Sequence, residues 1–600
     1  MLSAKFLPAI LAAMASRAAA AGGGQQKTPA EIAEEMQEIA ENVNVSYWLG
    51  WTWLACTAAL MVYLVGITFV RYVRGIACLN NPQQRYFAEP NWWYGRFKRY
   101  LFDSPLFRTR HHREYKLSSA INVGTLPSRL QTIYLVGYFG MNVAFSVIFI
   151  DFSSEGAASE LRNRTGVLCV MNMLPLFLLA GRNNPLIKIT GISFDTFNLV
   201  HRWVGRIVIL QALTHTVAYL VPKVQKGGWE AFTASLAKSE FILWGTIGTI
   251  SFLVIFIQAA GPVRHAFYEI FLHFHVLLAA LGLAGVWIHC AAGQLHQFHI
   301  VKAVLGIWVV ERFLRLFWII LRNVGNGGTK AEIESLPGDC LRINLQIARP
   351  WRFKTGQHVY LYIPSIGWWT SHPFSLAWSE EQEAWSEEKG MSLERLDLSG
   401  LGKTTMSLLV RRRTGFTDKL YKKVEQSPSG KLVTSALVEG PYGYQDLTSY
   451  GTVMLFAAGI GITHQVPHVR NLVEAYDKRT AAVRRITLVW VIQSPEHLEW
   501  IRPWMTEILS MPNRRDVLKI LLFVTRPRST KEIHSPSSSV QMFPGKPNIQ
   551  ALVDQEMVEG VGACAISVCG TGSLADDVRR AARVRQTRWN VDFFEEAFSW

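Results

Sequence analysis

Apolar and polar positions follow two different patterns in the two halves of the chain. Up to about residue 321, long apolar runs alternate with short polar or basic stretches, and a run of about 20 apolar residues crosses a bilayer as a helix. The pattern predicts seven membrane spans, near residues 47–70, 130–150, 167–180, 194–221, 241–260, 268–289 and 301–321.

The second half has the pattern of soluble domains. Residues 330–447 hold short runs of alternating apolar and polar positions, such as CLRINLQIA and HVYLYIP, which predict a small antiparallel β-barrel. From residue 448 to 600, apolar strand-like runs alternate with helical patterns, and this alternation predicts a parallel sheet of the dinucleotide-binding type.

The region before the second span carries targeting and topology signals. Residues 1–21 combine one lysine, a short apolar run and a small-residue end, so we interpret them as a signal peptide. Residues 22–125 then comprise an extracellular segment, the first span and a long basic loop, and the loop is expected to be cytosolic. The two Asn-X-Ser/Thr triplets, at Asn44 and Asn163, then both face outside, where they are candidate glycosylation sites. Seven spans that start outside place the C-terminal half in the cytosol.

Four histidines share one spacing inside this apolar sequence. His201 and His215 are 14 residues apart in the fourth span, and His275 and His289 are 14 residues apart in the sixth. In a helix, 14 residues bring two side chains within about 40° of one face and about 21 Å apart along the axis. Two such helices side by side offer two stacked pairs of facing imidazoles, which is the ligand set of two bis-histidine hemes.

A simpler interpretation exists for each of these residues. A single histidine in an apolar helix usually packs in the core, but four at matched spacing are costly in lipid and favour ligands. Neighbouring small residues leave room for a flat macrocycle, or equally let helices pack closely; they are Gly205, Ala212, Gly282 and Gly285. Arg202 and Arg206 either anchor the helix at the interface or pair with propionates of the inner heme.

Composition excludes some classes of function. The net charge of +16 does not indicate nucleic-acid binding, because the basic residues collect in loops that flank apolar segments. The seven cysteines contain no CxxC pair, so neither a zinc site nor a disulfide framework is predicted.

In the last domain, a strand leads into the turn AAGIGIT, and a helix follows the turn. Backbone amides can bind a pyrophosphate at such a helix N-terminus, although this glycine turn alone is a weak signal.

In combination, these motifs resemble the ferric reductase and NADPH oxidase superfamily, and most of all the fungal plasma-membrane ferric/cupric reductases. The resemblance covers nearly everything after about residue 120. The motifs that carry it occur in the family's order: GRNNPL, HRWVGR, YEIF, GQHVYLYIP, HPFSLA, EGPYG, AGIGIT, CGTGS and EEAFSW. It implies a six-helix heme domain at 126–325, followed by a cytosolic ferredoxin-reductase-like module with an FAD barrel at 330–447 and an NADPH-binding domain at 448–600.

The resemblance also implies site residues. His201, His215, His275 and His289 would ligate two b-type hemes. His372, Pro373, Phe374 and Ser375 would hold FAD, with Ser375 near flavin N5. The NADPH phosphates would lie at Gly459, Gly461, Ile462 and Thr463, the nicotinamide at Cys569 and Gly570, and Trp600 would cover the flavin. Ala458 and Gln493 depart from the family pattern, and Arg526 with Arg528 are candidates to bind the 2′-phosphate instead.

The function implied is a transmembrane metalloreductase that moves electrons from cytosolic NADPH through FAD and two hemes to external ferric or cupric ions or chelates. His296 and His299 are candidates to gather those ions, or simply belong to a polar loop. The membrane would be the plasma membrane or the vacuole, with an iron permease and a ferroxidase as compatible partners. Two alternatives stay open: a superoxide-generating NADPH oxidase, and a non-enzymatic seven-span receptor or transporter with a nucleotide-sensing tail.

Overall fold

The computed structural model describes residues 28–116, 122–325, 327–368, 370–381, 404–527, 535 and 537–596. The chain forms two compact units. The first comprises Met1–Val65 and Tyr134–Arg312, and the second comprises Gly66–Ile133 and Phe313–Trp600. The predicted signal peptide at 1–21, and Arg528 and Trp600 among the predicted site residues, lie outside the described residues.

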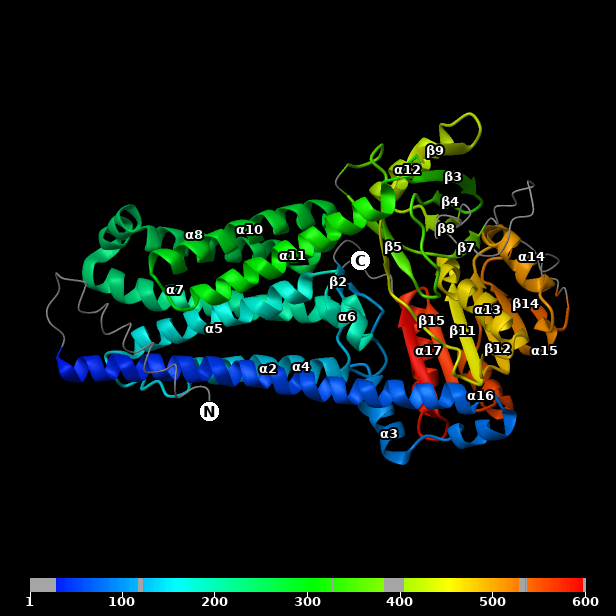
Figure 1. Cartoon of the computed structure of the whole chain (residues 1–600), viewed down its shortest axis with the longest axis horizontal. Helices are drawn as coiled ribbons and strands as arrows, with labels where there is room; N and C mark the ends of the chain where they lie inside the picture. Colours follow the sequence, from blue (N-terminus) through cyan, green and yellow to red (C-terminus); the bar gives the residue numbers. More distant parts are fainter. Residues whose placement is uncertain are drawn as a thin grey trace, which may run out of the picture. The chain divides into compact units, whose positions relative to one another are not determined.

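Among the described residues, six helices are long and apolar enough to cross a membrane. They are α2 (Pro29–Ala77), α4 (Arg129–Val147), α5 (Ala157–Ala180), α7 (Phe194–Lys238), α8 (Glu240–Gln258) and α10 (Tyr268–Ala292) (Figure 1). Short helices α6 (Pro185–Thr190) and α9 (Gly261–Ala266) join some of them. The first six predicted spans are thus found as helices.

The predicted seventh span is helix α11 (Phe298–Asn323), which is continuous but is not among the six apolar candidates. Lys302, Glu311, Arg312 and Arg315 interrupt its apolar sequence. The count of seven spans therefore stays a prediction. Helix α11 belongs partly to each unit, since the boundary falls after Arg312.

Two helices are longer than the sequence pattern predicts. Helix α2 begins at Pro29 rather than near residue 47, because the helical segment before the first span continues into it without a break. At its other end it continues past residue 70 to Ala77. Helix α7 extends to Lys238, with a kink at Gly227 and Gly228 where the backbone leaves helical geometry.

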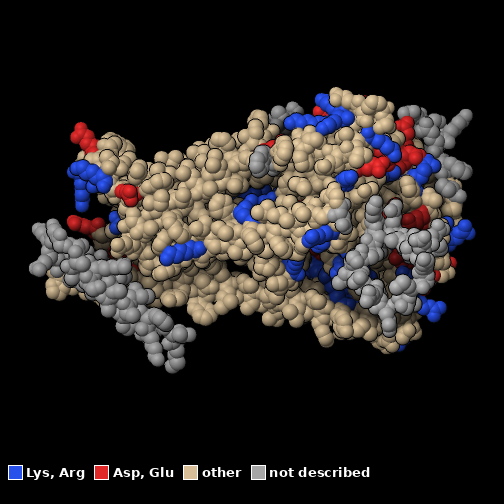
Figure 2. All heavy atoms as spheres, turned by 45° about the horizontal axis from the view of Figure 1, so that its top comes forward, with Lys and Arg blue, Asp and Glu red and all other residues tan. Residues whose placement is uncertain are grey.

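The outer surface of the helical unit has few charges. Figure 2 shows a broad surface over this part of the molecule on which lysine, arginine, aspartate and glutamate are sparse. Large apolar side chains are exposed there, for example Phe256 and Ile257 on α8 and Ile270, Phe274 and Leu277 on α10. In water such a surface would be unfavourable, so it fits contact with lipid chains.

A buried polar network connects three helices inside this unit. The Tyr138 hydroxyl donates to Asn172, and the Asn172 amide donates to Asn142 at 2.6 Å and to Gln211 at 3.0 Å. Each of the four residues is at most 7% exposed. Because an unpaired amide is costly in an apolar interior, this network holds α4, α5 and α7 in one register.

The FAD-type domain consists of two antiparallel sheets. One has the order β7-β8-β4-β3-β9 and the other β10-β5-β6. The strands are β3 (Lys330–Leu336), β4 (Cys340–Gln346), β5 (His358–Tyr362), β6 (His372–Ser375), β7 (Trp378–Glu381), β8 (Thr404–Arg411), β9 (Lys431–Ser435) and β10 (Leu437–Tyr442). They enclose one apolar core that includes Ile343, Leu361 and Leu408. The antiparallel arrangement is as predicted, but among the described residues it is two sheets rather than one closed barrel, with α12 (Phe416–Glu425) packed on β3 and β9.

The end of α11 is fixed to this domain. The Asn323 side chain donates to the Val438 carbonyl and accepts from the Val438 N–H, both at 2.8 Å, so it pairs with β10 as a neighbouring strand would. The Arg315 guanidinium donates to both oxygens of Glu439, a fully buried carboxylate that Tyr362 and Tyr442 also donate to.

The nucleotide-type domain is a six-stranded parallel sheet, as the alternating pattern predicts. Its order is β14-β13-β12-β11-β15-β16. The strands are β11 (Thr452–Ala458), β12 (Arg485–Ile492), β13 (Leu518–Val524), β14 (Val540–Pro544), β15 (Cys564–Cys569) and β16 (Val591–Glu596); the helices are α13 (Ile462–Asp477), α14 (Arg502–Ser510), α15 (Arg514–Val517), α16 (Ile549–Glu559) and α17 (Gly572–Arg585). Separate apolar clusters bury the two faces of the sheet.

Residues 71–113, which we call the strap, pack on this sheet within the second unit. The strap comprises the end of α2, the short 3₁₀ helix η1 (Asn81–Phe87), helix α3 (Trp92–Phe97) and the π-helical turn η2 (Lys98–Phe102). The short antiparallel strands β1 (Tyr115–Lys116) and β2 (Asn122–Gly124) come after it. The N–H groups of His111, His112 and Arg113 all donate to the Asp576 carboxylate of α17. The long basic loop expected from the sequence is therefore a folded part of this unit.

Candidate functional site

The four matched histidines lie in facing pairs within the helical unit. Helix α7 carries His201 and His215, and helix α10 carries His275 and His289. The ring centres of His201 and His275 are 6.2 Å apart, and those of His215 and His289 are 6.1 Å apart. The structure thus brings together the pairs that the 14-residue spacing predicts.

Hydrogen bonds fix the tautomer of three of the four rings. Nδ1 of His201 lies 2.9 Å from the Leu176 carbonyl, Nδ1 of His215 lies 2.7 Å from that of Arg162, and Nδ1 of His289 lies 2.7 Å from that of Phe241. A carbonyl only accepts, so each Nδ1 carries the proton and each Nε2 keeps a free lone pair. Buried Nδ1 of His275 has no partner among the described residues.

These observations fit the heme group that the spacing suggests. Metal–imidazole bonds are about 2 Å long, so two imidazoles on one iron have ring centres about 6 Å apart. Both pairs have that separation. A ligating histidine also usually donates its second N–H to a carbonyl or carboxylate, as His201, His215 and His289 do. The donor set and its supporting bonds therefore suit bis-histidine iron, although the role of these residues stays a prediction.

Two glycines that the sequence analysis did not identify support the pair of His215 and His289. A Cβ on Gly166 of α5 would lie 2.7 Å from Nδ1 of His215, and a Cβ on Gly245 of α8 would lie 2.7 Å from Nδ1 of His289. Each glycine is four residues after the carbonyl that its histidine contacts. The same local arrangement thus occurs twice, and only glycine leaves room for the imidazole to reach the helix backbone.

Replacing Gly166 with alanine is expected to displace His215. The added Cβ would meet Nδ1 at 2.7 Å, closer than such atoms approach, so the ring must turn away from the Arg162 carbonyl. On the bis-histidine hypothesis, the purified variant loses about one of two hemes, measured by absorbance per chain. Gly140→Ala in α4 is the matched control, because nothing lies within 4 Å of its added Cβ. Equal heme content in the Gly166 variant and the parent would contradict the arrangement.

The small residues and arginines near the histidines have mixed surroundings. Gly282 and Gly285 pack α10 against Phe252 and Gly248 of α8, which favours the close-packing interpretation. The Arg206 guanidinium lies over the Trp203 ring at 4.5 Å. Propionate binding by Arg202 and Arg206 is untested and stays a prediction.

The HPFS segment predicted to hold FAD forms strand β6. His372, Pro373, Phe374 and Ser375 pair with β5, and the His372 ring stacks on Phe416 with centres 4.6 Å apart. Ser375 is 7% exposed, and the other three are half-buried. The strand therefore offers an aromatic ring, a hydroxyl and backbone amides on one short segment, as a flavin needs.

The two segments predicted to hold NADPH meet at the point where the strand order reverses. Strands β12, β13 and β14 lie on one side of β11 in the sheet, whereas β15 and β16 lie on the other side. Ligands of such sheets bind in the crevice at the carboxyl ends beside this reversal. A Cβ on Gly461 would overlap the Cys569 carbonyl, and one on Gly570 would lie 2.7 Å from the Ala458 Cβ. Glycine at these positions lets the two turns touch, and Gly459 adopts a φ of +52°.

The side chains of the other residues predicted at the nucleotide site are buried or already hydrogen-bonded. The Thr463 hydroxyl donates to the Ile460 carbonyl, and Ile462 is fully buried, so these residues can offer backbone N–H groups but not their side chains. Cys569 is 1% exposed, and burial with nearby Glu596 and Glu595 raises the pKa of its thiol well above the ordinary value. Cys569 is therefore a neutral lining group at pH 7, not a thiolate.

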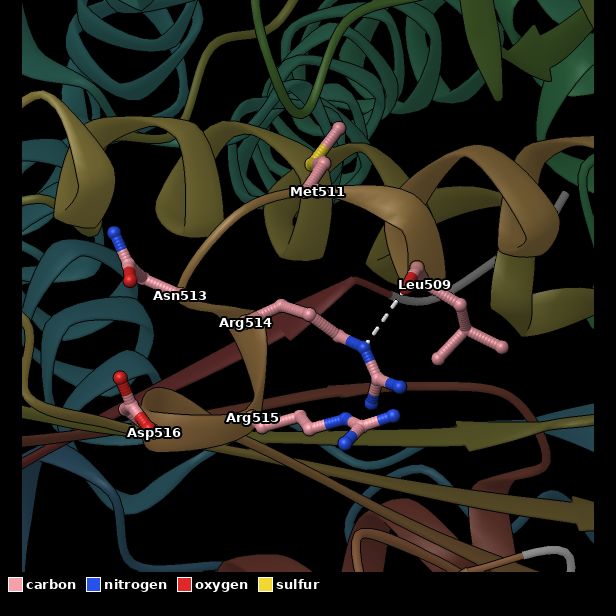
Figure 3. Close-up of a pocket in the computed structure, with 6 residues that line it drawn as sticks. All are labelled: Leu509, Met511, Asn513, Arg514, Arg515 and Asp516. Carbon is pink, nitrogen blue, oxygen red and sulfur yellow. Dashed lines mark hydrogen bonds between the residues drawn. The ribbon is translucent and has the colours of Figure 1, made fainter.

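A separate hollow of about 340 Å³ lies at α15 and does not belong to this crevice. Figure 3 shows its lining, which includes Arg514 and Arg515; the Arg514 Nε–H donates to the Leu509 carbonyl at 2.9 Å. Helix α15 comes directly before β13, so the hollow lies at the amino end of that strand. The nucleotide turns lie at the opposite, carboxyl ends.

The strap places cations around a carboxylate on β16, and sequence analysis did not identify this cluster. Nζ of Lys98, a residue only 3% exposed, lies 3.0 Å from Oδ1 of Asp592, and the Tyr450 hydroxyl donates to Oδ2 at 2.5 Å. The Arg74 guanidinium lies 3.9 Å from Oδ2 and over the Tyr450 ring. Burial alone would raise the pKa of Asp592, but Lys98, Arg74 and Arg71 lower it below its ordinary value.

The pKa of a second buried carboxylate on β16, that of Glu595, is also lowered by nearby cations. Burial opposes ionisation of Glu595, but Arg579 and His112 lower its pKa to about 2. A carboxyl whose pKa is lower in the folded state stabilises the fold above its unfolded pKa of about 4, and that stability is lost as the pH falls toward the folded value. The shift at Glu595 corresponds to about 3 kcal/mol.

We therefore expect the thermal unfolding midpoint of the purified protein to fall steeply between pH 5 and pH 3. The loss should be smaller in Glu595→Gln, because that variant has no carboxyl at this position to protonate. Unfolding midpoints measured from pH 7 to pH 3 test this. A parent midpoint that stays constant down to pH 3 would contradict the assigned ion pairs.

Three family models match the chain, in the order that the sequence motifs predict. They are described as a ferric reductase like transmembrane component over residues 165–286, an FAD-binding domain over 326–387 and a ferric reductase NAD binding domain over 450–583. The predicted resemblance is thereby confirmed. The chain is an oxidoreductase with membrane-spanning helices followed by FAD-binding and NAD-binding domains.

Individual relatives have low sequence identity to this chain but align with most of its length. Ferric/cupric reductase transmembrane component 1 of Candida albicans is 24% identical, over 96% of this chain and 75% of its own length. Ferric/cupric reductase transmembrane component 2 of Saccharomyces cerevisiae is 25% identical, over 83% of this chain and 70% of its own length. Among solved structures, a ferredoxin reductase in carbazole 1,9a-dioxygenase matches 45% of this chain and 70% of that chain, with 14% identity and a TM-score of 0.30.

Proposed function

We propose that this chain, which matches the models of a ferric reductase like transmembrane component, an FAD-binding domain and a ferric reductase NAD binding domain, is a transmembrane metalloreductase. It takes electrons from cytosolic NADPH, uses FAD and two b-type hemes as carriers, and reduces ferric or cupric ions or chelates outside the membrane. The observation that carries this proposal is the pair of facing histidine pairs, each with ring centres about 6 Å apart. The names of the fungal relatives support the choice of metal as acceptor.

In this proposal the helical unit holds the hemes. His201 and His275 ligate the inner one, and His215 and His289 ligate the outer one. When bound, the hemes supply one-electron carriers and FAD accepts the two electrons of NADPH. The protein fixes the imidazoles through the carbonyls of Leu176, Arg162 and Phe241. Because two histidines would hold each heme iron, the hemes would supply electron transfer and leave no ligand position for the metal substrate.

The second unit binds the two nucleotides. His372, Pro373, Phe374 and Ser375 on β6 would hold FAD, the Phe374 ring as an apolar surface for the flat flavin and Ser375 as a polar partner for its edge. The backbone amides at the start of α13 and the turn at Gly570 would hold the pyrophosphate and the nicotinamide. Arg526, which is exposed directly after β13, is a candidate for the 2′-phosphate together with Arg528.

The proposal extends to location and surroundings. The chain resides in the plasma or vacuolar membrane, contributes to iron uptake, and is glycosylated at Asn44 and Asn163. The two asparagines belong to neighbouring parts of the helical unit, since the Asn163 amide donates to Glu38 at 2.7 Å. A glycan on Asn163 requires that this bond be absent. His296 and His299 are both exposed, so they are free to gather metal ions.

Reduction of membrane-impermeant chelates by intact cells tests the proposed function. Cells that produce the protein should reduce ferric and cupric chelates well above the rate of cells without it, and superoxide dismutase should not lower that rate. Superoxide release without direct chelate reduction would instead favour an oxidase. Absence of a reduced b-type heme band from the purified protein would favour a non-enzymatic receptor or transporter.

A further inference from the structure

Two buried acceptor atoms at the strap have no hydrogen-bond donor among the described residues. One is Nδ1 of His111 and the other is Oε1 of Glu595. His111 is 9% exposed and the Glu595 side chain 6% exposed. The His111 ring also bonds the backbone of Leu126, and because Nδ1 is without a partner, that bond uses Nε2. Nδ1 therefore presents a lone pair.

A second imidazole completes the cluster, and it contacts the same carboxylate. Nε2 of His112 lies 3.1 Å from the other oxygen of Glu595, Oε2. One ligand atom from each of His111, His112 and Glu595 can be chosen such that all three lie within 4.8 Å of one another. Two imidazoles and one carboxylate are a ligand set that zinc uses in proteins, and a fourth position stays open for water.

The three residues are held in place by their surroundings. The N–H groups of His111, His112 and Arg113 all donate to Asp576, so this turn of the strap cannot move freely. Glu595 belongs to β16, which pairs with β15 along its length. A site built on rigid backbone loses little entropy when it binds an ion.

The nearest cation does not prevent binding. The Arg579 guanidinium donates to Oε2 of Glu595 and leaves Oε1 without a donor. A carboxylate that binds a metal through one oxygen is commonly hydrogen-bonded through the other. Asp576 adds a second negative charge beside the two histidines. One atom each of His111, His112 and Glu595 can therefore reach one divalent ion, which would replace the proton that His112 shares with Glu595.

We propose that His111, His112 and Glu595 form a binding site for one divalent transition-metal cation, with Zn²⁺ as its representative. The ion joins the strap to β16. It also lies close to the predicted nicotinamide turn, since a Cβ on Gly572 would overlap the His112 carbonyl. The site belongs to the second unit and does not depend on the heme histidines or on the proposed function.

The test is zinc binding to the purified full-length protein after chelator treatment, with Zn²⁺ alone as the probe. Zinc per chain is counted after desalting, and affinity is measured by competition with a chromophoric chelator. The parent should bind one more zinc than His111→Gln or Glu595→Gln, or bind it at least tenfold more tightly. Bound Co²⁺ should give the parent, and neither variant, the visible absorption of a four- or five-coordinate site.

The matched control is His273→Gln, which removes an exposed histidine of the helical unit with no proposed metal role and should keep the site. His111→Gln keeps Glu595 and its ion pairs, so it distinguishes loss of a ligand from loss of the fold if Glu595→Gln does not fold. The proposal is wrong if the parent and His111→Gln bind the same number of zinc ions with the same affinity. It is also wrong if only the control loses zinc.

Discussion

Replacing His289 with alanine is expected to lower reduction of external chelates at least a hundredfold. His289 faces His215 with ring centres 6.1 Å apart, and its Nδ1 is held by the Phe241 carbonyl, so the variant removes one residue that would hold the proposed outer heme. In the proposed function, electrons would then have no carrier on the outer side of the membrane. Chelate reduction by intact cells and heme content of the purified protein measure the effect.

The same variant should leave the cytosolic half of the reaction intact. The FAD-type and nucleotide-type domains contain no part of α10, so NADPH oxidation with a soluble acceptor that takes electrons from the flavin should stay within about twofold of the parent. His273→Ala is the matched control, because His273 is on the same helix, is exposed and bonds the Glu269 carbonyl of its own helix. Equal external rates in His289→Ala and His273→Ala would contradict the ligand assignment.

Replacing Lys98 with methionine is expected to destabilise the second unit by about 3–5 kcal/mol. Nζ of Lys98 donates to the Val591 carbonyl at 2.8 Å and lies 3.0 Å from Oδ1 of Asp592. Methionine fills much of the same volume but leaves the carboxylate partly uncompensated in the interior. Thermal or denaturant unfolding of the full-length protein, followed at the transition of this unit, measures the loss.

The matched control for this prediction is Lys422→Met. Lys422 also pairs with an aspartate, Asp418 at 2.8 Å, but its side chain is 58% exposed. Ion pairs in water contribute little, so this variant should unfold with the parent. If Lys98→Met also unfolds with the parent, the strap does not stabilise the nucleotide-type domain. The loss of stability in Asp592→Asn should lie between those of Lys98→Met and Lys422→Met, because the asparagine keeps a polar partner for Lys98.

Local patterns were sufficient to predict the elements that carry the proposed chemistry. Long apolar runs predicted the membrane helices, because a segment in lipid must satisfy its own backbone and repeat apolar residues along its whole length. The equal spacing of His201–His215 and His275–His289 predicted the facing pairs, since helix geometry alone sets the face and depth. Alternating strands and helices predicted the parallel sheet for the same local reason.

The strap could not be predicted in this way. Lys98 and Asp592 are 494 positions apart, and His111 and Asp576 are 465 apart. The basic residues of the strap match the composition of a cytosolic loop equally well, so charge alone predicted topology but not a folded segment. The contacts of the strap depend on which turn of α17 and which edge of β16 are exposed to it. A single sequence does not specify which parts of these elements are exposed.

Other differences also come from tertiary context. Thr463 follows a glycine turn and resembles a phosphate ligand, yet its hydroxyl satisfies the Ile460 carbonyl because the start of α13 is buried. Helix α2 continues through residues 42–46 because no proline or glycine interrupts it there. Gly166 and Gly245 each lie four residues after a carbonyl that a histidine contacts. Their role could be predicted from this spacing only if it were known which helices pack together.

The number of b-type hemes per chain tests the central claim most directly. The purified protein, reduced with dithionite, should give the absorption of bis-histidine heme at two hemes per chain, and each of the four single histidine variants should lose about one. A parent protein without heme, or four variants that all keep two, would contradict the account.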